Sequence, residues 1–182
     1  MAVMVPSGDE NIIEQYARTH DIVEVGTDEI EWIDFAEMHG ICTEYLRDNF
    51  VVAIASPRGA ILANIAPTLP SNNANDNNSR SAHIFNRLRE VLWVYDANRG
   101  LFDGLRCRTF VVAAAARGAA LLPADRDAIV SLLRGRGLHP IIQQKYECPQ
   151  NCREDGSGFL IIKPAPHWNL PGVYLDQRCI GG

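Results

Sequence analysis

Two apolar runs joined by a short polar turn are the feature of this sequence that most constrains its fold. Residues 50–55 and 60–66 are almost entirely apolar, and each is too short for a helix of ordinary length. Residues 56–59, Ser-Pro-Arg-Gly, have the composition of a tight turn. The pattern predicts a β-hairpin. Because both faces of its strands are apolar, we expect it at the centre of a sheet covered on both sides.

Polar side chains return only at the ends of this hairpin. Asp48 and Asn49 precede the first run, and Asn64 lies near the end of the second. We therefore expect any chemistry or binding at this polar edge, in a cleft lined by Asn49 and Asn64, with His39 as a further lining residue.

The rest of the chain predicts strands and helices around the hairpin. We expect strands at residues 22–26, 29–35, 109–116, 138–146, 159–163 and 172–175, and helices at residues 9–18, 82–95 and 123–136. This order predicts one α/β (α+β) domain over residues 1–182, with a mixed, largely antiparallel sheet or sandwich and flanking helices. The Asn-rich residues 71–81 predict an exposed loop insertion, which is either a lid or a tolerated insertion.

Composition and charge limit the classes of partner. The net charge of -5 argues against a general nucleic-acid binder, although Arg99, Arg106 and Arg108 form either a local basic strip or a solvated face. No apolar run approaches the ~20 residues that cross a bilayer. Five cysteines without a secretory signal suggest reduced thiols in the cytoplasm, although a secreted chain after signal removal would look the same. The expected partner is a small molecule or another protein.

One cysteine stands where reactive chemistry is plausible. Residues 37–47 mix polar and apolar types, and possible helix-forming residues follow Cys42. A cysteine at the start of a helix is near unpaired amide groups that favour its thiolate. A histidine beside it in the fold would complete the thiolate-imidazolium pair of a cysteine hydrolase. We take Cys42 and His83, on opposite sides of the hairpin in sequence, as the candidate catalytic pair, with His39, His139 and His167 as other possible bases.

The remaining cysteines give weaker signals. Cys148 and Cys152 could bind zinc with His139 or Cys179, or they are two loop thiols or a facultative disulfide, which is the interpretation we adopt. Cys107 lies between two arginines that would lower its pKa. The sequence has no phosphate-binding glycine loop, G-x-S-x-G or H-E-x-x-H motif, and we predict neither a metal nor a cofactor.

Several short motifs occur in an order that points to a known family. Val25-Gly26 is followed by His-Gly-Ile-Cys at residues 39–42, the apolar run 51–55, Ser56-Pro57, and Ile-Ala-Pro at residues 65–67. Residues 129–137, 138–142 and 159–163 add a late helix and closing strands. From Ile22 onward the chain thus resembles the chemoreceptor glutamine deamidases (CheD) and the cysteine-hydrolase fold that they share with the cytotoxic necrotizing factor toxins.

The resemblance implies an enzyme whose cysteine attacks a glutamine side-chain amide while a histidine transfers protons and ammonia is released. Aligning the hairpin by its proline places Asn49 at the cysteine position and Asn64 at the histidine position. Aligning Cys42 with the family cysteine instead leaves residues 43–49 as an insertion and His83 as the nearest candidate base.

Three functional hypotheses follow from these alignments. The favoured one is a catalytically silent relative, a pseudoenzyme, that binds a small molecule or protein in the cleft. The alternative is a cysteine-dependent amidohydrolase or glutamine deamidase that uses Cys42. A different reaction in the same cleft is the third, so whether the protein is an enzyme stays open at this point.

Overall fold

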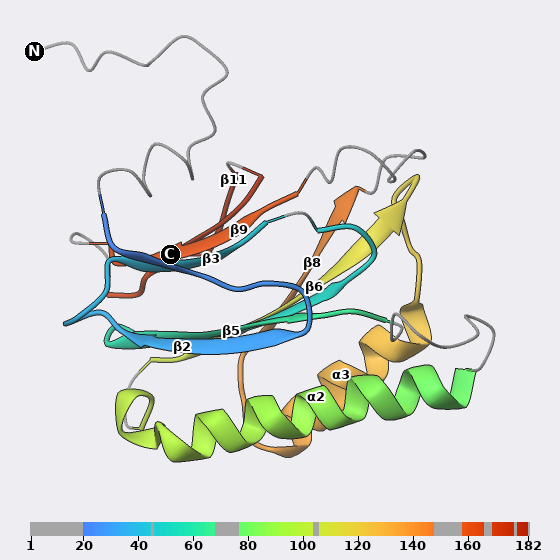
Figure 1. Ribbon diagram of the computed structural model, residues 1–182, viewed down its shortest axis with the longest axis horizontal. Helices are drawn as coiled ribbons and strands as arrows, with labels where there is room; N and C mark the ends of the chain where they lie inside the picture. The colour runs from blue at the N-terminus through green and yellow to red at the C-terminus, as the bar shows by residue number, and fades with distance from the viewer. Residues whose placement is uncertain are drawn as a thin grey trace, which may run out of the picture.

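Two β-sheets and two helices form three layers in the described part of the chain. The computed structural model describes residues 20–44, 46–67, 77–103, 106–147, 158–165, 169–176 and 178–181. Sheet A lies on one side, sheet B lies in the middle, and helices α2 and α3 cover the far face of sheet B (Figure 1). The expected mixed, largely antiparallel α+β architecture with flanking helices is confirmed.

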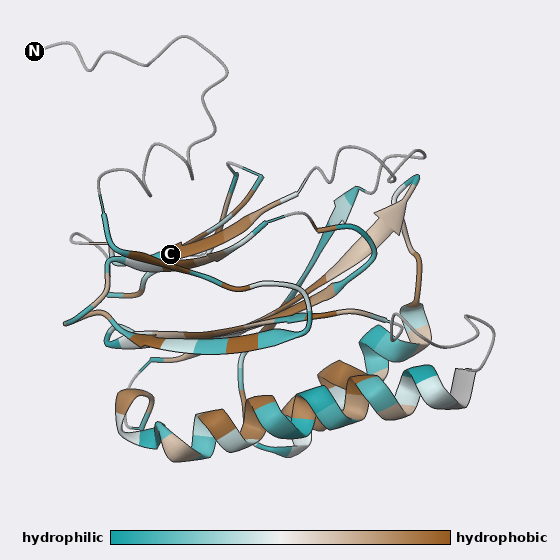
Figure 2. Cartoon of the chain, in the orientation of Figure 1, coloured by the Kyte–Doolittle hydropathy of each residue, from teal (hydrophilic) through white to brown (hydrophobic). Residues whose placement is uncertain are grey.

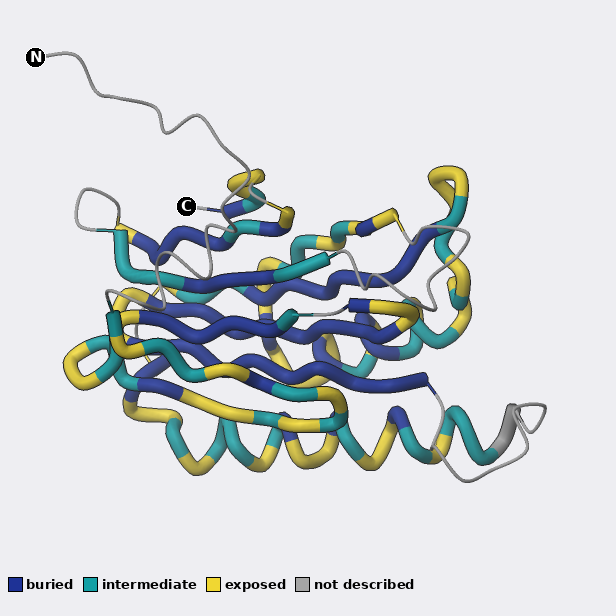
Figure 3. Tube along the Cα trace, turned by 45° about the horizontal axis from the view of Figure 1, so that its top comes forward, coloured by how far each residue is buried: buried dark blue, intermediate teal, exposed yellow. Residues whose placement is uncertain are grey.

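The predicted hairpin is at the centre of sheet B. β4 (Phe50–Ala55) and β5 (Gly59–Ile65) pair antiparallel, and every residue in both strands is buried. β2 (Glu29–Asp34) pairs with β5 on one side, and β6 (Arg108–Ala116) pairs with β4 on the other. Both predictions, the hairpin and its central place, are confirmed, and Figure 3 shows these strands as continuous buried segments.

Sheet B is completed by a parallel strand beyond β6. α3 (Pro123–Gly135) connects β6 to β8 (Ile141–Glu147), and β8 then pairs with β6 in parallel, as expected when a helix forms the crossover. The short β7 (Ala119–Ala120) turns back on the end of β6.

Sheet A is assembled from the two ends of the described chain. β1 (Ile22–Glu24) pairs in parallel with β3 (Gly40–Thr43), and β3 pairs antiparallel with β9 (Leu160–Lys163). β10 (Gly172–Leu175) and β11 (Arg178–Gly181) extend the sheet beyond β9. Consecutive strands near the start of the chain therefore alternate between the sheets: β1 and β3 lie in sheet A, whereas β2 and β4 lie in sheet B.

Alternation along each central strand separates two apolar layers. In β4, Val51, Ala53 and Ala55 face sheet A, whereas Phe50, Val52 and Ile54 face the helices. α2 (Asn77–Ala97) contributes Ile84, Leu88 and Val91 to the helix-side layer, and η1 (Arg99–Leu101) follows it. Figure 2 shows apolar and polar stretches mixed along both helices, as expected for helices with one covered side. No described helix combines the length and hydropathy that a membrane crossing requires.

Two expectations about local structure are wrong. Residues 40–43, expected to lead into a helix, form the buried strand β3, because pairing with β1 and β9 covers both of its edges. Residues 77–81, expected as the end of the Asn-rich loop, are the first residues of α2. Residues 71–76 of that loop and the expected helix at residues 9–18 lie outside the described residues.

The remaining strand and helix predictions agree with the structure apart from their boundaries. Strand β8 begins three residues later than expected, and α2 begins five residues earlier. The short strands β7 and β11 were not predicted, because β7 has only two residues and β11, Arg-Cys-Ile-Gly, is not an apolar run.

Candidate functional site

Two asparagine side chains meet at the polar end of the hairpin. Asn49 immediately precedes β4 and Asn64 lies near the end of β5, both on the side that faces sheet A. Asn49 Nδ2 donates to Asn64 Oδ1 at 2.7 Å, and the two residues are 4% and 0% exposed. The contact forms because the hairpin register places position 49 diagonally across from position 64. The structure thus brings together the two asparagines that the sequence singled out.

A threonine from sheet A extends this contact across the sandwich. Asn64 Nδ2 donates to Thr43 Oγ1 at 2.8 Å, and the Thr43 hydroxyl donates to the Val25 carbonyl oxygen at 2.7 Å. Thr43 is fully buried, and it points inward because Ile41, two residues earlier on the strand, also does. Asn49, Asn64 and Thr43 therefore form a directional chain of hydrogen bonds that ends on the backbone of sheet A. We call these three residues the Asn-Asn-Thr chain.

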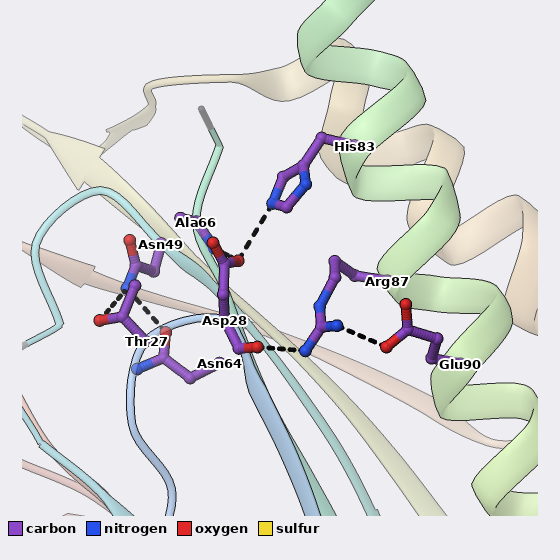
Figure 4. Close-up of polar contacts among 8 residues, drawn as sticks. All are labelled: Thr27, Asp28, Asn49, Asn64, Ala66, His83, Arg87 and Glu90. Atoms are coloured by element: carbon purple, nitrogen blue, oxygen red, sulfur yellow. Dashed lines mark hydrogen bonds and ion pairs between the residues drawn. The ribbon is translucent and has the colours of Figure 1, made fainter. Parts of the chain in front are cut away.

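The turn between β1 and β2 lies between the Asn-Asn-Thr chain and α2, and it contacts both asparagines. Thr27 Oγ1 lies 3.5 Å from Asn49 Nδ2 (Figure 4). The Asp28 amide donates to the Asn64 carbonyl oxygen at 2.7 Å. Asp28 adopts a positive φ of 60°, a conformation that aspartate tolerates better than most residues. The turn is thereby joined to the main chain and side chains of the site.

Helix α2 holds the same turn from the opposite side. Asp28 Oδ1 accepts the Ala66 amide at 2.9 Å and lies 3.1 Å from His83 Nε2. Arg87 donates to the Asp28 carbonyl oxygen and pairs with Glu90 on the same helix (Figure 4). His83 therefore contacts the site through Asp28 and not through either asparagine.

A tyrosine connects the site to an open groove. The Tyr146 hydroxyl, from β8, donates to the Asn49 carbonyl oxygen at 2.8 Å. Burial, followed by the charges of Asp48 and Asp176, raises the pKa of this hydroxyl, so it stays protonated and able to donate. A groove of about 460 Å³ lies beside it. It is lined by Lys145, Tyr146, Glu147, Leu175, Asp176 and Arg178.

The structure places Cys42 on the other face of β3. Its side chain packs with Ile161 outside the sandwich interior, whereas the neighbouring Thr43 points inward. Burial raises the pKa of the Cys42 thiol to about 12, and the charges of Glu44 and Glu24 act in the same direction. The expected helix terminus that would favour a thiolate is absent, because residues 40–43 form a strand.

The expected pair of Cys42 and His83 is not brought together. His83 sits on α2, beyond the helix-side face of sheet B, while Cys42 lies on the outer face of sheet A. His39 is exposed, precedes β3 at the end opposite Thr43, and packs its ring edge-on against His20 at 5.3 Å. Neither His39 nor Cys42 contacts the asparagine pair.

The other cysteines are placed as follows. The expectation for Cys107 is wrong: burial raises the pKa of its thiol, Asp103 raises it further, and Sγ lies 3.2 Å from the Phe102 carbonyl oxygen. Cys179 is exposed on β11. Cys148, Cys152 and His167 lie outside the described residues. Within the described ranges no three His, Cys, Asp or Glu side chains are grouped to hold a metal ion.

Sequence reasoning missed Thr43, Asp28 and Tyr146. Thr43 had a usable signal, since an inward Ile41 on a strand implies an inward Thr43 and an outward Cys42. The Tyr146 contact had none, because it joins residues 97 positions apart.

The groups that meet here limit the chemistry of the site. Carboxamides are neutral and do not titrate, but each combines two donor hydrogens with an acceptor oxygen. In Figure 4 the Asn49 Oδ1 points away from Thr27 and Asn64, and it accepts no hydrogen bond from any residue the structure describes. The site therefore offers an acceptor in a fixed position.

Comparison with models of protein families and with curated protein sequences finds no match to this chain.

Proposed function

We propose that this protein is a catalytically silent relative of the CheD-like deamidase fold, and that it binds a small molecule or protein at the polar end of the central hairpin. The observation that carries the proposal is the Asn-Asn-Thr chain. Asn49 contacts Asn64 at 2.7 Å and Asn64 contacts Thr43 at 2.8 Å. A nucleophile, a base within hydrogen-bond reach and a third group that orients the base have this same linear arrangement.

Side-chain chemistry separates a silent site from an active one. The hairpin alignment puts Asn49 at the nucleophile position and Asn64 at the base position. A carboxamide neither attacks a carbonyl carbon readily nor accepts a proton near neutral pH. It still donates and accepts hydrogen bonds, so binding can persist where the reaction is lost.

The groove beside Tyr146 supplies the space that this proposal needs. Its volume, about 460 Å³, lies in the range of small-ligand pockets. Tyr146 contributes to the groove and also donates to the Asn49 carbonyl oxygen, so this one residue joins the groove to the hairpin end, while the Asn-Asn-Thr chain itself does not line the groove. Free thiols at Cys42, Cys107 and Cys179 support a cytoplasmic protein.

Restoring the family residues tests the proposal. In the double variant Asn49→Cys/Asn64→His, the new thiol should have a pKa well below that of an ordinary thiol, because an imidazolium lies beside it. The measurement is the pH dependence of iodoacetamide alkylation at position 49. Asn49→Cys alone is the matched control and should titrate as an ordinary or buried thiol. Equal profiles for the two variants would contradict the proposed geometry.

Activity and thiol mapping test the silence of the natural protein. It should bind peptides containing glutamine without releasing ammonia, and Cys42 should be alkylated no faster than the other cysteines. Ammonia release that is abolished by Cys42→Ala would instead establish the cysteine-dependent amidohydrolase. Absence of both binding and turnover with these peptides would exclude them as ligands of a silent deamidase site and contradict the proposal.

A further inference from the structure

Charge is distributed unevenly between two parts of the chain. Residues 20–44, which contain β1, β2 and β3, hold eight Asp or Glu residues and no Lys or Arg. Residues 77–136, which run from α2 to just beyond α3, hold ten Arg against five Asp or Glu. The excess negative charge of the protein is therefore concentrated around β1–β3 and not spread over its surface.

Strand β2 lies at the edge of sheet B within this acidic part. It pairs with β5 and with no other described strand (Figure 1). The Phe35 amide donates to the Arg58 carbonyl oxygen, and the Ile33 carbonyl oxygen approaches Gly59, so odd-numbered positions direct their main-chain groups to β5. In an antiparallel pair the alternate positions face outward. Ile30 and Trp32 therefore direct their N–H and C=O groups to the open edge.

The side chains of β2 define what could pair with this edge. Glu29 and Glu31 lie on the face toward sheet A and are exposed, while Trp32 lies on the opposite face with 44% of its surface exposed. A second copy of the chain added antiparallel here would bring glutamates close to glutamates, which is unfavourable. A strand with basic side chains on one face and apolar side chains on the other fits both faces of β2.

We propose that the β2 edge binds a basic peptide segment in extended conformation, which adds to sheet B as a further strand. Main-chain hydrogen bonds to Ile30 and Trp32 would hold the segment, its cations would lie beside Glu29 and Glu31, and an apolar side chain would cover Trp32. Acidic residues on an edge strand also prevent self-association, but that role does not require an exposed tryptophan at its centre. This inference does not depend on the proposed function of the hairpin site.

A synthetic peptide of about seven residues that alternates lysine and valine is the probe, since this length matches an ordinary strand. Fluorescence anisotropy of the labelled peptide should show binding to the full chain that weakens as salt is added. Glu31→Lys should weaken binding about fivefold, and Trp32→Ala by a similar factor. The control Asp127→Lys makes the same charge change on α3 and should alter binding by less than about twofold.

The peptide backbone provides the decisive comparison. Methylation of alternate peptide nitrogens removes the donors that would face β2, and should weaken binding at least about tenfold with side chains unchanged. A peptide that alternates glutamate and valine should not bind. Equal binding of the methylated peptide, equal binding of the acidic peptide, or equal losses for Glu31→Lys and Asp127→Lys would each overturn the proposal. Urea unfolding of each variant confirms that the fold is retained.

Discussion

The two ends of the central hairpin both bury polar groups, but they do so in different ways. At the turn end, the Ser56 hydroxyl accepts the amides of Arg58 and Gly59 and donates to the Leu101 carbonyl oxygen at 2.7 Å. At the other end, Asn49 and Asn64 bond to each other and then to Thr43 in a different sheet. The first end satisfies backbone groups, mostly within its own turn, whereas the second joins side chains from separate strands.

This difference makes the asparagine end the candidate for a role beyond folding. Turn chemistry of the Ser56 kind is common, because short polar side chains readily bond nearby main-chain groups. Side chain to side chain hydrogen bonds in the interior are the least common class in proteins, and they must be fully matched to be stable. A chain of three such residues, linked to a groove through Tyr146, is therefore a candidate site, while the turn is a structural element.

The turn end should give the largest loss of stability on substitution. In Gly59→Ala the added Cβ would lie 2.4 Å from the Ile33 carbonyl oxygen, a backbone atom that can move only if β2 and β5 separate. We expect a loss of about 3 kcal/mol in the free energy of unfolding, measured by urea denaturation. Gly100→Ala, where the Cβ would meet no atom within 4 Å, is the control and should change stability little. Equal effects would remove the evidence for close strand packing here.

Substitution at the asparagine end should cost less stability than at the turn end, but its effect should depend on Thr43 in the other sheet. Asn64→Ala leaves the Asn49 amide without its acceptor and the Thr43 hydroxyl without its donor, which should cost about 2 kcal/mol. A double-mutant cycle with Thr43→Val should show a coupling free energy of about 1 kcal/mol. The same cycle between Ser56→Ala and Thr43→Val should be additive. Coupling in both cycles would remove the distinction between the two ends.

Cys42 sharpens the comparison because it adjoins Thr43 yet lies outside the site. Its folded-state pKa, about 12, exceeds the 9.0 of an ordinary thiol, so above about pH 9 the unfolded chain loses a proton that the folded chain keeps. Stability should therefore fall as pH rises. Urea unfolding should show that the difference between the natural protein and Cys42→Ala shrinks by about 1 kcal/mol between about pH 8 and pH 10. A difference independent of pH would mean that the thiol is not buried.

The contact of His83 with the β1–β2 turn should have the smallest effect. His83→Gln removes a partly buried partner of Asp28 but leaves the Ala66 amide in place, so we expect a loss of about 0.5 kcal/mol. The measurement is again urea unfolding, near neutral pH. Glutamine can still donate to Asp28, whereas His83→Leu cannot and should lose more. If His83 were instead a catalytic base, His83→Gln would abolish a measurable turnover.

Local pattern predicted the fold well where strands are long and close in sequence. The hairpin, β6 and α3 follow from apolar runs and from Pro123 at the helix start, and neighbouring residues carry all of that information. β3 was misassigned because its four residues form a strand through pairing with β1 and with β9, and β9 comes more than a hundred residues later. The catalytic hypothesis for Cys42, which lies within β3, depended on the expected helix and therefore on the wrong element.

The candidate site was predicted only in part, because some of its contacts lie within one hairpin and others join strands that are far apart in the sequence. Asn49 and Asn64 were identified because they interrupt apolar surroundings within one hairpin, whose register the turn fixes. Thr43 and Tyr146 reach them only through the stacking of sheet A and the parallel crossover to β8. Such contacts depend on tertiary geometry, which no short sequence window contains.

The order of strands along the chain has a consequence for synthesis on the ribosome. Sheet B is complete once β8 ends at Glu147, but β9, β10 and β11 of sheet A are translated later. Until they emerge, Val51, Leu62 and Val112 on the inner face of sheet B lack the part of their apolar layer that Leu160, Ile162 and Val173 form. A nascent chain of this protein therefore exposes a broad apolar face late in translation, when chaperones that recognise such surfaces would have their best opportunity to bind it.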